Sequence, residues 1–294
     1  RLQVNKNGVQ ISSNNPVGLF YGIQTLGQLL PKEIESKTFI AGISWKIPFA
    51  NIQDTPRFAW RGMMFDVARH FFTKDQVKQF IDEMVAYKYN LLHLHLTDDE
   101  GWRIEIKSFP NLTKKGAFNV KKIGRFTEFS KPEPNEPRDF GGFFTQDDIR
   151  ELVKYAKERF VDIMPEIDVP GHSMAAVASY PELSCTPEAV NYQVISGEPF
   201  IDWSTDHAIA LQDNTLCPAN EKVYTFLDQV FGEVAELFPF EYMHMGGDEC
   251  PKNYWDKNPQ IQALRIKEGL NNSQEVQAYF TRRLEKIITS KGKK

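Results

Sequence analysis

Residues Glu241–Pro251 read EYMHMGGDECP, which places two glycines directly before two adjacent carboxylates, Asp248 and Glu249. Successive side chains of a strand point to opposite faces of a sheet, so adjacent acids on a strand would not share one site. Glycine frees the backbone from strand geometry and lets it approach a ligand closely. We therefore expect Asp248 and Glu249 to leave the strand and to face one cavity.

Two neighbouring carboxylates suit acid–base chemistry. Like charges repel, so one of the pair is expected to hold its proton beside an ionised partner, as a general acid requires. Retaining glycosidases usually place two carboxylates on separate elements across the sugar, which adjacent acids do not fit. They fit a mechanism in which the substrate's own 2-acetamido oxygen attacks the anomeric carbon. An acidic turn exposed to water is the alternative, but it leaves the glycine pair unexplained.

Polar residues also follow three earlier apolar runs, in the stretches DVARH, LTDDEGW and EIDVPGH. Asp98 and Asp99 leave a buried run, and buried acids are costly unless they are partnered or used. A Pro-Gly turn is expected to bring His172 back over the end of its strand, near Asp168. An Asp–His pair is the usual way to orient an imidazole, while a capped turn with a satisfied histidine is the alternative.

His93 and His95 form a His-x-His pair, which on a barrel strand is a known metal arrangement. We favour two hydrogen-bonded histidines inside the sheet instead, because only His172 and His244 lie near a later strand end. A metal-dependent hydrolase therefore ranks last of three candidate functions. No metal and no other cofactor are expected.

Four apolar runs predict strands that alternate with amphipathic helices: 61–68, 90–96, 161–169 and FEYMHMGG at 240–247. Thr73 with Gln76, and Thr145 with Asp148, are typical of helix starts. Strands that are apolar on both faces and alternate with helices indicate a parallel sheet covered on both sides. Polar residues at the strand ends favour a (β/α)8 barrel or an open α/β sheet, and no Gly-rich phosphate loop supports the nucleotide-binding version.

The predicted domains divide near residue 55. Residues 1–55 read as a hairpin and a helix ended by Pro31, the C-terminal part of a preceding small α+β domain with its linker. Residues 56–294 read as the N-terminal half of a (β/α)8 barrel, with about four to five of eight units. We expect this chain alone neither to close a barrel nor to turn over substrate. The stretch from the second strand to about Gly142 is expected to be a functional loop or lid.

Composition excludes several classes of protein. A net charge of -4 gives no electrostatic case for binding nucleic acid or an anionic membrane. No apolar run reaches the length of a membrane span. Three cysteines make no disulfide framework, and no CxxC pair indicates zinc. A Cys185–Cys217 bridge and reduced, buried cysteines both remain open.

Four stretches carry a family resemblance: FAWRGMMFDVARHFF, YKYNLLHLHLTDDEGWRIEI, MPEIDVPGH and HMGGDE. Together, in this order and at these spacings, they resemble the β-N-acetylhexosaminidases of glycoside hydrolase family 20. The resemblance covers most of residues 56–290, and residues 1–31 resemble the end of the small α/β domain that precedes the barrel in these enzymes. Such enzymes use the substrate-assisted scheme described above.

The resemblance implies a role for each matching residue. Glu249 would be the general acid/base, and Asp248 would orient the acetamido group and stabilise the oxazolinium intermediate. Arg69 would bind the sugar hydroxyls at C3 and C4, since its guanidinium is a bidentate donor. Asp98 and His172 would form a relay that tunes the acid/base.

Asp168 would support the same network. The family's acetamido-pocket tryptophans, with a tyrosine and an acid, come from strands five to eight and are not assigned in this sequence.

The function implied is exo-acting release of terminal GlcNAc or GalNAc from glycans, with retention. A lacto-N-biosidase-like variant remains open, as does a non-catalytic glycan-binding relative, against which intact Asp248 and Glu249 count. The partner is then a glycan with a terminal β-linked N-acetylhexosamine, and oligomeric state stays unassigned. The substrate class and the bacterial style of the loops predict a periplasmic, cell-surface or secreted protein.

Overall fold

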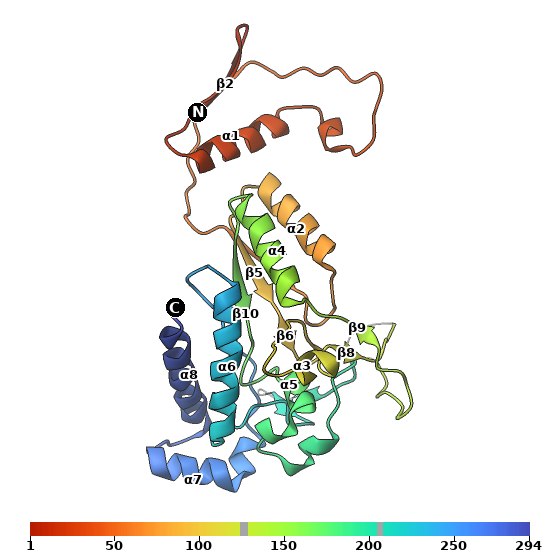
Figure 1. Cartoon of the computed structure of the whole chain (residues 1–294), viewed down its shortest axis with the longest axis vertical. Helices are drawn as coiled ribbons and strands as arrows, with labels where there is room; N and C mark the ends of the chain where they lie inside the picture. The colour runs from red at the N-terminus through yellow and green to blue at the C-terminus, as the bar shows by residue number, and fades with distance from the viewer. Residues whose placement is uncertain (124–128, 205–207) are drawn as a thin grey trace.

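Three parallel strands form the central sheet of the computed structural model, which describes residues 1–123, 129–204 and 208–294 (Figure 1). They are β4 (Gly62–Asp66), β5 (Leu91–His95) and β10 (Asp162–Glu166), in the order β10-β5-β4. Their register pairs Asp66 with His95 and His95 with Glu166, so the last residues of the three strands lie side by side. The first three predicted strands are therefore confirmed.

The fourth predicted strand, at 240–247, is wrong in extent, because only one isolated bridge joins His244 to Glu166. The His244 N–H donates to Pro165 O at 2.9 Å, and Ile167 N–H donates to His244 O at 3.1 Å, so the segment does follow β10. Gly246 and Gly247 then adopt φ values of +62° and +105°, which no strand uses. The glycine pair turns the backbone away directly after the bridge.

Long helices pack side by side along the outside of the sheet, α2 on α4, α4 on α6 and α6 on α8 (Figure 1). They are α2 (Lys74–Ala86), α4 (Gln146–Lys157), α6 (Glu221–Leu237) and α8 (Ser273–Ser290), while α7 (Pro259–Glu268) lies at the lower end of the view, away from the sheet. Both predicted helix starts are confirmed as capping boxes, at Thr73 with Gln76 and at Thr145 with Asp148. The apolar stripes of these helices and the buried side chains of β5 form one continuous core.

The stretch after β5, predicted to be a functional loop or lid, contains short helices and strands of its own, and residues 124–128 lie outside the described residues. It contains β6 (Thr97–Asp98), β7 (Gly101–Trp102), α3 (Asn111–Lys114), β8 (Phe118–Asn119) and β9 (Phe140–Gly141). The buried Arg103 side chain joins its parts by donating to the carbonyls of Ala68, Glu100 and Ala117. Backbone carbonyls held by one guanidinium fix this stretch against the end of β4.

A second excursion follows β10 and carries short elements. They are α5 (Met174–Ser179), η2 (Pro181–Leu183), η3 (Pro187–Asn191), β11 (Ile201–Asp202) and β12 (Ile209–Ala210), with η4 (Trp255–Lys257) after the bridge segment. Cys185 and Cys217 are joined by a disulfide, which settles the alternative that the sequence left open. Asn253 bonds both the N–H and the C=O of Ala210 at 3.0 Å, which ties the β11–β12 hairpin to the chain that follows Glu249.

The N-terminal residues form a separate small sheet with one helix. Its strands β1 (Leu2–Asn5), β2 (Gly8–Ile11) and β3 (Ala50–Ile52) are antiparallel in the order β2-β1-β3, and α1 (Pro16–Gln28) and η1 (Lys32–Glu35) accompany them. The predicted hairpin and helix are thus confirmed. Arg61 Nη2 donates to Tyr21 Oη at 2.7 Å and links this part to the start of β4. Within the described residues, no helix combines the length and apolarity needed to cross a membrane.

Candidate active site at the carboxyl ends of the strands

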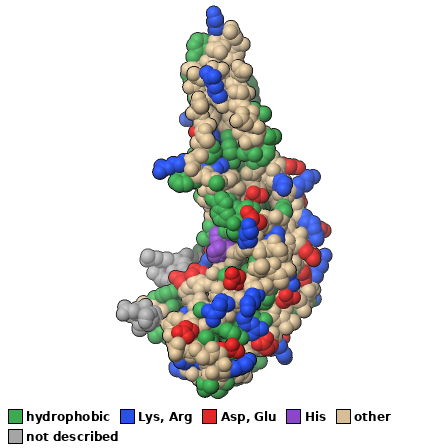
Figure 2. Space-filling model, turned by 90° about the vertical axis from the view of Figure 1, so that its left-hand side faces the viewer, with side chains coloured by type: hydrophobic (Ala, Val, Ile, Leu, Met, Phe, Trp, Pro, Cys, Tyr) green, Lys and Arg blue, Asp and Glu red, His purple; other side chains and the backbone are tan. Residues whose placement is uncertain are grey.

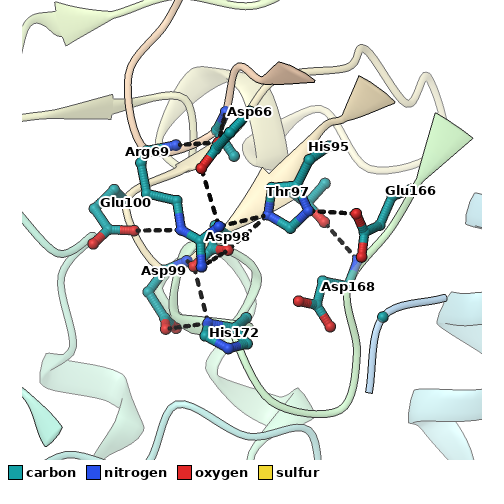
Figure 3. A network of polar contacts seen from close by, with 12 residues as sticks. Asp66, Arg69, His95, Thr97, Asp98, Asp99, Glu100, Glu166, Asp168 and His172 are labelled. Atoms are coloured by element: carbon teal, nitrogen blue, oxygen red, sulfur yellow. Dashed lines mark hydrogen bonds and ion pairs between the residues drawn. The ribbon is translucent and has the colours of Figure 1, made fainter. Parts of the chain in front are cut away.

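The carboxyl ends of β4, β5 and β10 bring the polar side chains together (Figure 3). Asp66, His95 and Glu166 end the three strands in register, and the loops that follow supply the remaining groups. Sites at this end of a parallel sheet are typical of barrel enzymes. Figure 2 shows, at the middle of one face, histidine, acidic and basic side chains exposed beside hydrophobic ones.

Asp98 lies at the centre of this group and its side chain is 1% exposed. Its Oδ1 atom accepts from the Asp99 N–H at 2.7 Å and from His172 Nδ1 at 3.1 Å. Its Oδ2 atom accepts from His95 Nε2 at 2.7 Å and from Arg69 Nη2 at 2.9 Å. Burial by itself raises the pKa of Asp98, but the hydrogen bonds from His172 and His95 outweigh it and hold that pKa well below its usual range. The Asp98 carboxylate is therefore ionised, and all four of its acceptor positions are used.

Arg69 lines a cavity with its side chain 34% exposed. Its Nη1 atom donates to Asp66 Oδ2 at 3.0 Å, and its Nη2 atom donates to Asp98. The other Asp66 oxygen accepts the N–H groups of Ala68 and Arg69, which fixes the backbone of the DVARH turn. Each terminal nitrogen keeps a second hydrogen, so the guanidinium can still donate to a ligand.

His172 is held by two aspartates, with Nδ1 at 3.1 Å from Asp98 Oδ1 and 3.3 Å from Asp99 Oδ2. His172 does lie near Asp168, within 4.8 Å, and the predicted contact between Asp98 and His172 is present, but Asp98 and Asp99 rather than Asp168 orient the imidazole. Burial lowers the pKa of His172, but the bonds to Asp98 and Asp99 outweigh it and raise the pKa to about 12. His172 is thus an imidazolium whose Nε2 makes no hydrogen bond among the described residues and lies 3.5 Å from Glu249 Oε2, close enough for an ion pair.

Asp168 supports the glycine turn from behind. Its Oδ1 atom accepts the Gly247 N–H at 2.9 Å, and its own N–H donates to Thr97 Oγ1 at 3.0 Å. A Cβ atom on Gly246 would lie 1.8 Å from Asp168 Oδ1, so no larger residue fits without moving the carboxylate. Close approach and positive φ together explain why glycine occurs here.

Asp248 and Glu249 both leave the sheet and are exposed, as the glycine pair predicts. Glu249 adopts a φ of +45° and lines the same cavity as Arg69 and His172. The Asp248 carboxylate lies within 4.8 Å of polar atoms of Asp168 and His172, although Asp248 is not among the residues that line the cavity. Of the two acids, Glu249 is therefore the one that lines the cavity as expected.

The cavity has a volume of about 400 Å³ and includes residues that the sequence analysis did not single out. These are Asp66, Glu100, Glu198, Pro199, Phe200, Ile201 and Trp203. Glu100 directly follows the two aspartates of LTDDEGW, and this position could have identified it as a candidate site residue. Burial, with repulsion from Asp98 and Asp99, raises its pKa well above the usual range. The wall from Glu198 to Trp203 comes from two-residue strands that leave no periodic pattern in the sequence.

His93 and His95 are hydrogen-bonded inside the sheet, which confirms the favoured interpretation. Glu166 accepts from His93 Nε2 at 2.7 Å, His95 Nδ1 at 2.6 Å and His244 Nδ1 at 2.9 Å. Burial raises the pKa of Glu166, but the bonds from the histidines outweigh it and hold that pKa far below its usual range. Polar atoms of His93, Glu166 and His244 lie within 4.8 Å of one another, and the hydrogen bonds to Glu166 account for this closeness.

The sequence that builds this site matches a known family. The profile of the catalytic domain of glycosyl hydrolase family 20 matches residues 58–294, and the profile of domain 2 of the same family matches residues 1–55. The chain belongs to glycosyl hydrolase family 20. The resemblance carried by the four motifs is thereby confirmed, and so is the barrel-type catalytic fold, of which the chain covers part.

Relatives of this family 20 chain include bacterial β-hexosaminidases. It is 39% identical over 293 residues to a β-hexosaminidase of Porphyromonas gingivalis, covering 100% of this chain and 34% of the relative. It is 39% identical over 295 residues to a β-hexosaminidase of Vibrio furnissii, covering 100% and 44%. A crystal structure of the exo-β-N-acetylglucosaminidase of Vibrio harveyi with N-acetylglucosamine superposes with a TM-score of 0.80, at 38% identity, covering 99% and 42%. The chain thus spans about a third to a half of these relatives.

Gly246→Ala should displace Asp168 and the turn that carries the two acids. Misplacing a reacting group by about 1 Å costs on the order of 100-fold, so we expect kcat/KM of the natural enzyme to fall by about that factor. Gly269→Ala is the matched control, because Gly269 has a φ of +67° but open space around its Cβ position. It should cost about 1 kcal/mol of stability and leave kcat/KM within about twofold. Equal kinetic effects of the two substitutions would contradict this account of the turn.

Asp168→Asn should change how stability depends on pH. Burial raises the pKa of Asp168 to about 7, more than the charge of His172 lowers it. A raised folded-state pKa gives stability that is present at low pH and is lost as pH rises through about 7. Asparagine does not titrate, so the variant should gain stability relative to wild type between pH 5 and pH 8. Urea unfolding at both pH values measures this, and a difference that stays constant with pH would contradict it.

Proposed function

We propose that the protein carrying this sequence is an exo-acting β-N-acetylhexosaminidase that releases terminal β-linked GlcNAc or GalNAc with retention. The observation that carries the proposal is the turn at Gly246 and Gly247, which projects two adjacent carboxylates from the sheet beside an arginine-lined cavity. The structure of the Vibrio harveyi relative with N-acetylglucosamine supports this class of substrate.

Glu249 is the general acid and then the general base. Its side chain is 52% exposed at the cavity wall, where it can meet the glycosidic oxygen. The Nε2–H of the His172 imidazolium, 3.5 Å away, stabilises the carboxylate that remains once the proton has left. The same contact keeps Glu249 as the carboxylate, which is the form that then accepts a proton from water.

In the scheme we propose, the substrate supplies its own nucleophile and Asp248 acts on the acetamido group. The acetamido oxygen attacks C1 while the bond from C1 to the leaving oxygen breaks, and Glu249 gives its proton to that oxygen. The oxazolinium that forms is positively charged. The Asp248 carboxylate stabilises this charge and accepts a hydrogen bond from the oxazolinium N–H. Water then attacks C1 from the side of the leaving group and gives a proton to Glu249, which restores the amide with retained configuration.

Arg69 binds the sugar at its non-reducing end. Asp66 and Asp98 hold its two terminal nitrogens in place, so little rotamer entropy is lost when the remaining N–H groups meet a vicinal diol. Hydroxyls at C3 and C4 fit that fork. A chain extended at C4 would lose one of these bonds, which agrees with exo action.

The test uses the natural gene product that contains these 294 residues, with the aryl β-glycosides of N-acetylglucosamine and of glucose. We expect rapid release from the first substrate only, because glucose has no acetamido group to attack C1. Glu249→Gln should lower kcat by about 10²- to 10⁴-fold, which is the usual contribution of a general acid.

Two results would contradict the proposal in different ways. Comparable release from both glycosides would show that the amide is not the nucleophile, and the role of Asp248 would be lost. Binding of N-acetylglucosamine without release of either aglycone would favour the glycan-binding relative instead.

A further inference from the structure

The hydrogen bonds of the site continue beyond Asp98 into the sheet (Figure 3). His95 bridges two buried carboxylates, with Nε2 at 2.7 Å from Asp98 Oδ2 and Nδ1 at 2.6 Å from Glu166 Oε2. Because Asp98 also holds His172, a continuous series runs from Glu166 through His95 and Asp98 to the imidazole that faces Glu249. Neither Glu166 nor His95 has a role in the scheme given above.

The two short contacts of His95 fix its protonation state. A neutral imidazole donates from one nitrogen only, so its other nitrogen would face a carboxylate oxygen with no proton between them. Placing the extra proton on Asp98 is unfavourable, because this carboxylate already meets the Asp99 N–H, His172 Nδ1 and Arg69 Nη2 besides His95. Glu166 likewise accepts from His93 and His244 besides His95. His95 therefore carries both protons and is a buried imidazolium.

The charges that face His95 agree with this assignment. Asp98 and Glu166 lie against its two nitrogens, and Asp168 Oδ atoms lie within 4.8 Å of the same group. The one cation facing it among the described residues is Arg69, whose Nη1 lies 3.3 Å from Nε2 and is itself bonded to Asp66. Burial lowers the pKa of His95, but the bonds to Asp98 and Glu166 outweigh it and raise the pKa to about 10.

We propose that Glu166 and His95 are positioning residues for the acid/base step: Glu166 holds His95 charged, and charged His95 keeps Asp98 ionised and aimed at His172. The inference rests on the proposed function, since it concerns how Glu249 exchanges its proton. Ion pairs buried in this way are weak sources of stability, so their presence beside a reacting group indicates a functional role.

Glu166→Gln removes the charge and keeps the shape. The amide introduced by this substitution gives His95 one neutral acceptor, which no longer favours the imidazolium, and Asp98 then loses a charged donor. Impaired proton donation matters most when the leaving group is poor. We therefore expect kcat/KM to fall more for the β-1,4-linked disaccharide of N-acetylglucosamine than for its 4-nitrophenyl glycoside. The two falls should differ at least tenfold, within the roughly 10- to 100-fold range usual for the loss of such supporting bonds.

His93→Gln is the matched control, because His93 bonds the same Glu166 oxygen but makes no contact with Asp98. The ratio of the two kcat/KM values should stay within about twofold of wild type in this variant. An equal fall for both substrates in Glu166→Gln, or a shifted ratio in both variants, would show a structural role only and would overturn the proposal.

The protonation state of His95 can be measured without any turnover, which keeps this inference separate from the proposed function and from folding of the variant. In the wild-type protein labelled with ¹⁵N-histidine, both ring nitrogens of His95 should remain protonated up to pH 8. A neutral His95 at pH 7, with one unprotonated nitrogen, would overturn the proposal whether or not the enzyme hydrolyses hexosaminides.

Discussion

The site depends on one buried carboxylate, Asp98, whose four acceptor positions are all filled. One donor, Arg69, binds the sugar in our scheme, and another, His172, faces the acid/base Glu249. Because both oxygens of one rigid carboxylate are used, the sugar-binding cation and the catalytic imidazolium keep a fixed distance. Asp98 therefore couples the position of the substrate to proton transfer, although in this scheme it contacts neither the sugar nor Glu249.

Burying so many charges is costly, and the structure offsets the cost locally. Carboxylates outnumber cations among the buried groups. In Asp99, Glu100 and Asp168 burial outweighs the favourable contacts and raises the pKa values. The ones that are surrounded by donors, Asp98 and Glu166, have lowered pKa values. The sheet register makes this arrangement, because it places Asp66, His95 and Glu166 side by side.

Short-range sequence patterns predicted the parts of the fold that depend on residues close together in the chain. Three strands, two capping boxes, the N-terminal hairpin and the catalytic turn follow from apolar runs, caps and glycines within a few residues of one another. The extent of the segment at 240–247 was misjudged because glycines that serve the turn also end the strand. Alternation of apolar residues cannot show where such a turn begins.

Contacts between distant residues could be predicted only in part. The motifs named six residues and the contact of Asp98 with His172, but they did not show that Asp99 also holds His172, which depends on the packing of loops far apart in sequence. The Glu198–Trp203 wall includes only one two-residue strand, β11, which pairs with β12 while Asn253 holds Ala210 of β12, so no periodic pattern marks it. The Glu166–His95 pair needed the strand register, which one sequence does not contain.

The most direct test of the coupling through Asp98 is a double-mutant cycle on kcat/KM. Arg69→Lys and His172→Gln would be made singly and together in the natural enzyme, and again in an Asp98→Asn background. Members of one hydrogen-bond network couple by about 0.5–3 kcal/mol, so we expect an interaction energy of about 1 kcal/mol or more that disappears in the Asp98→Asn background. Additive effects in the wild-type background would contradict the account, because the two residues would then act independently of the carboxylate that joins them.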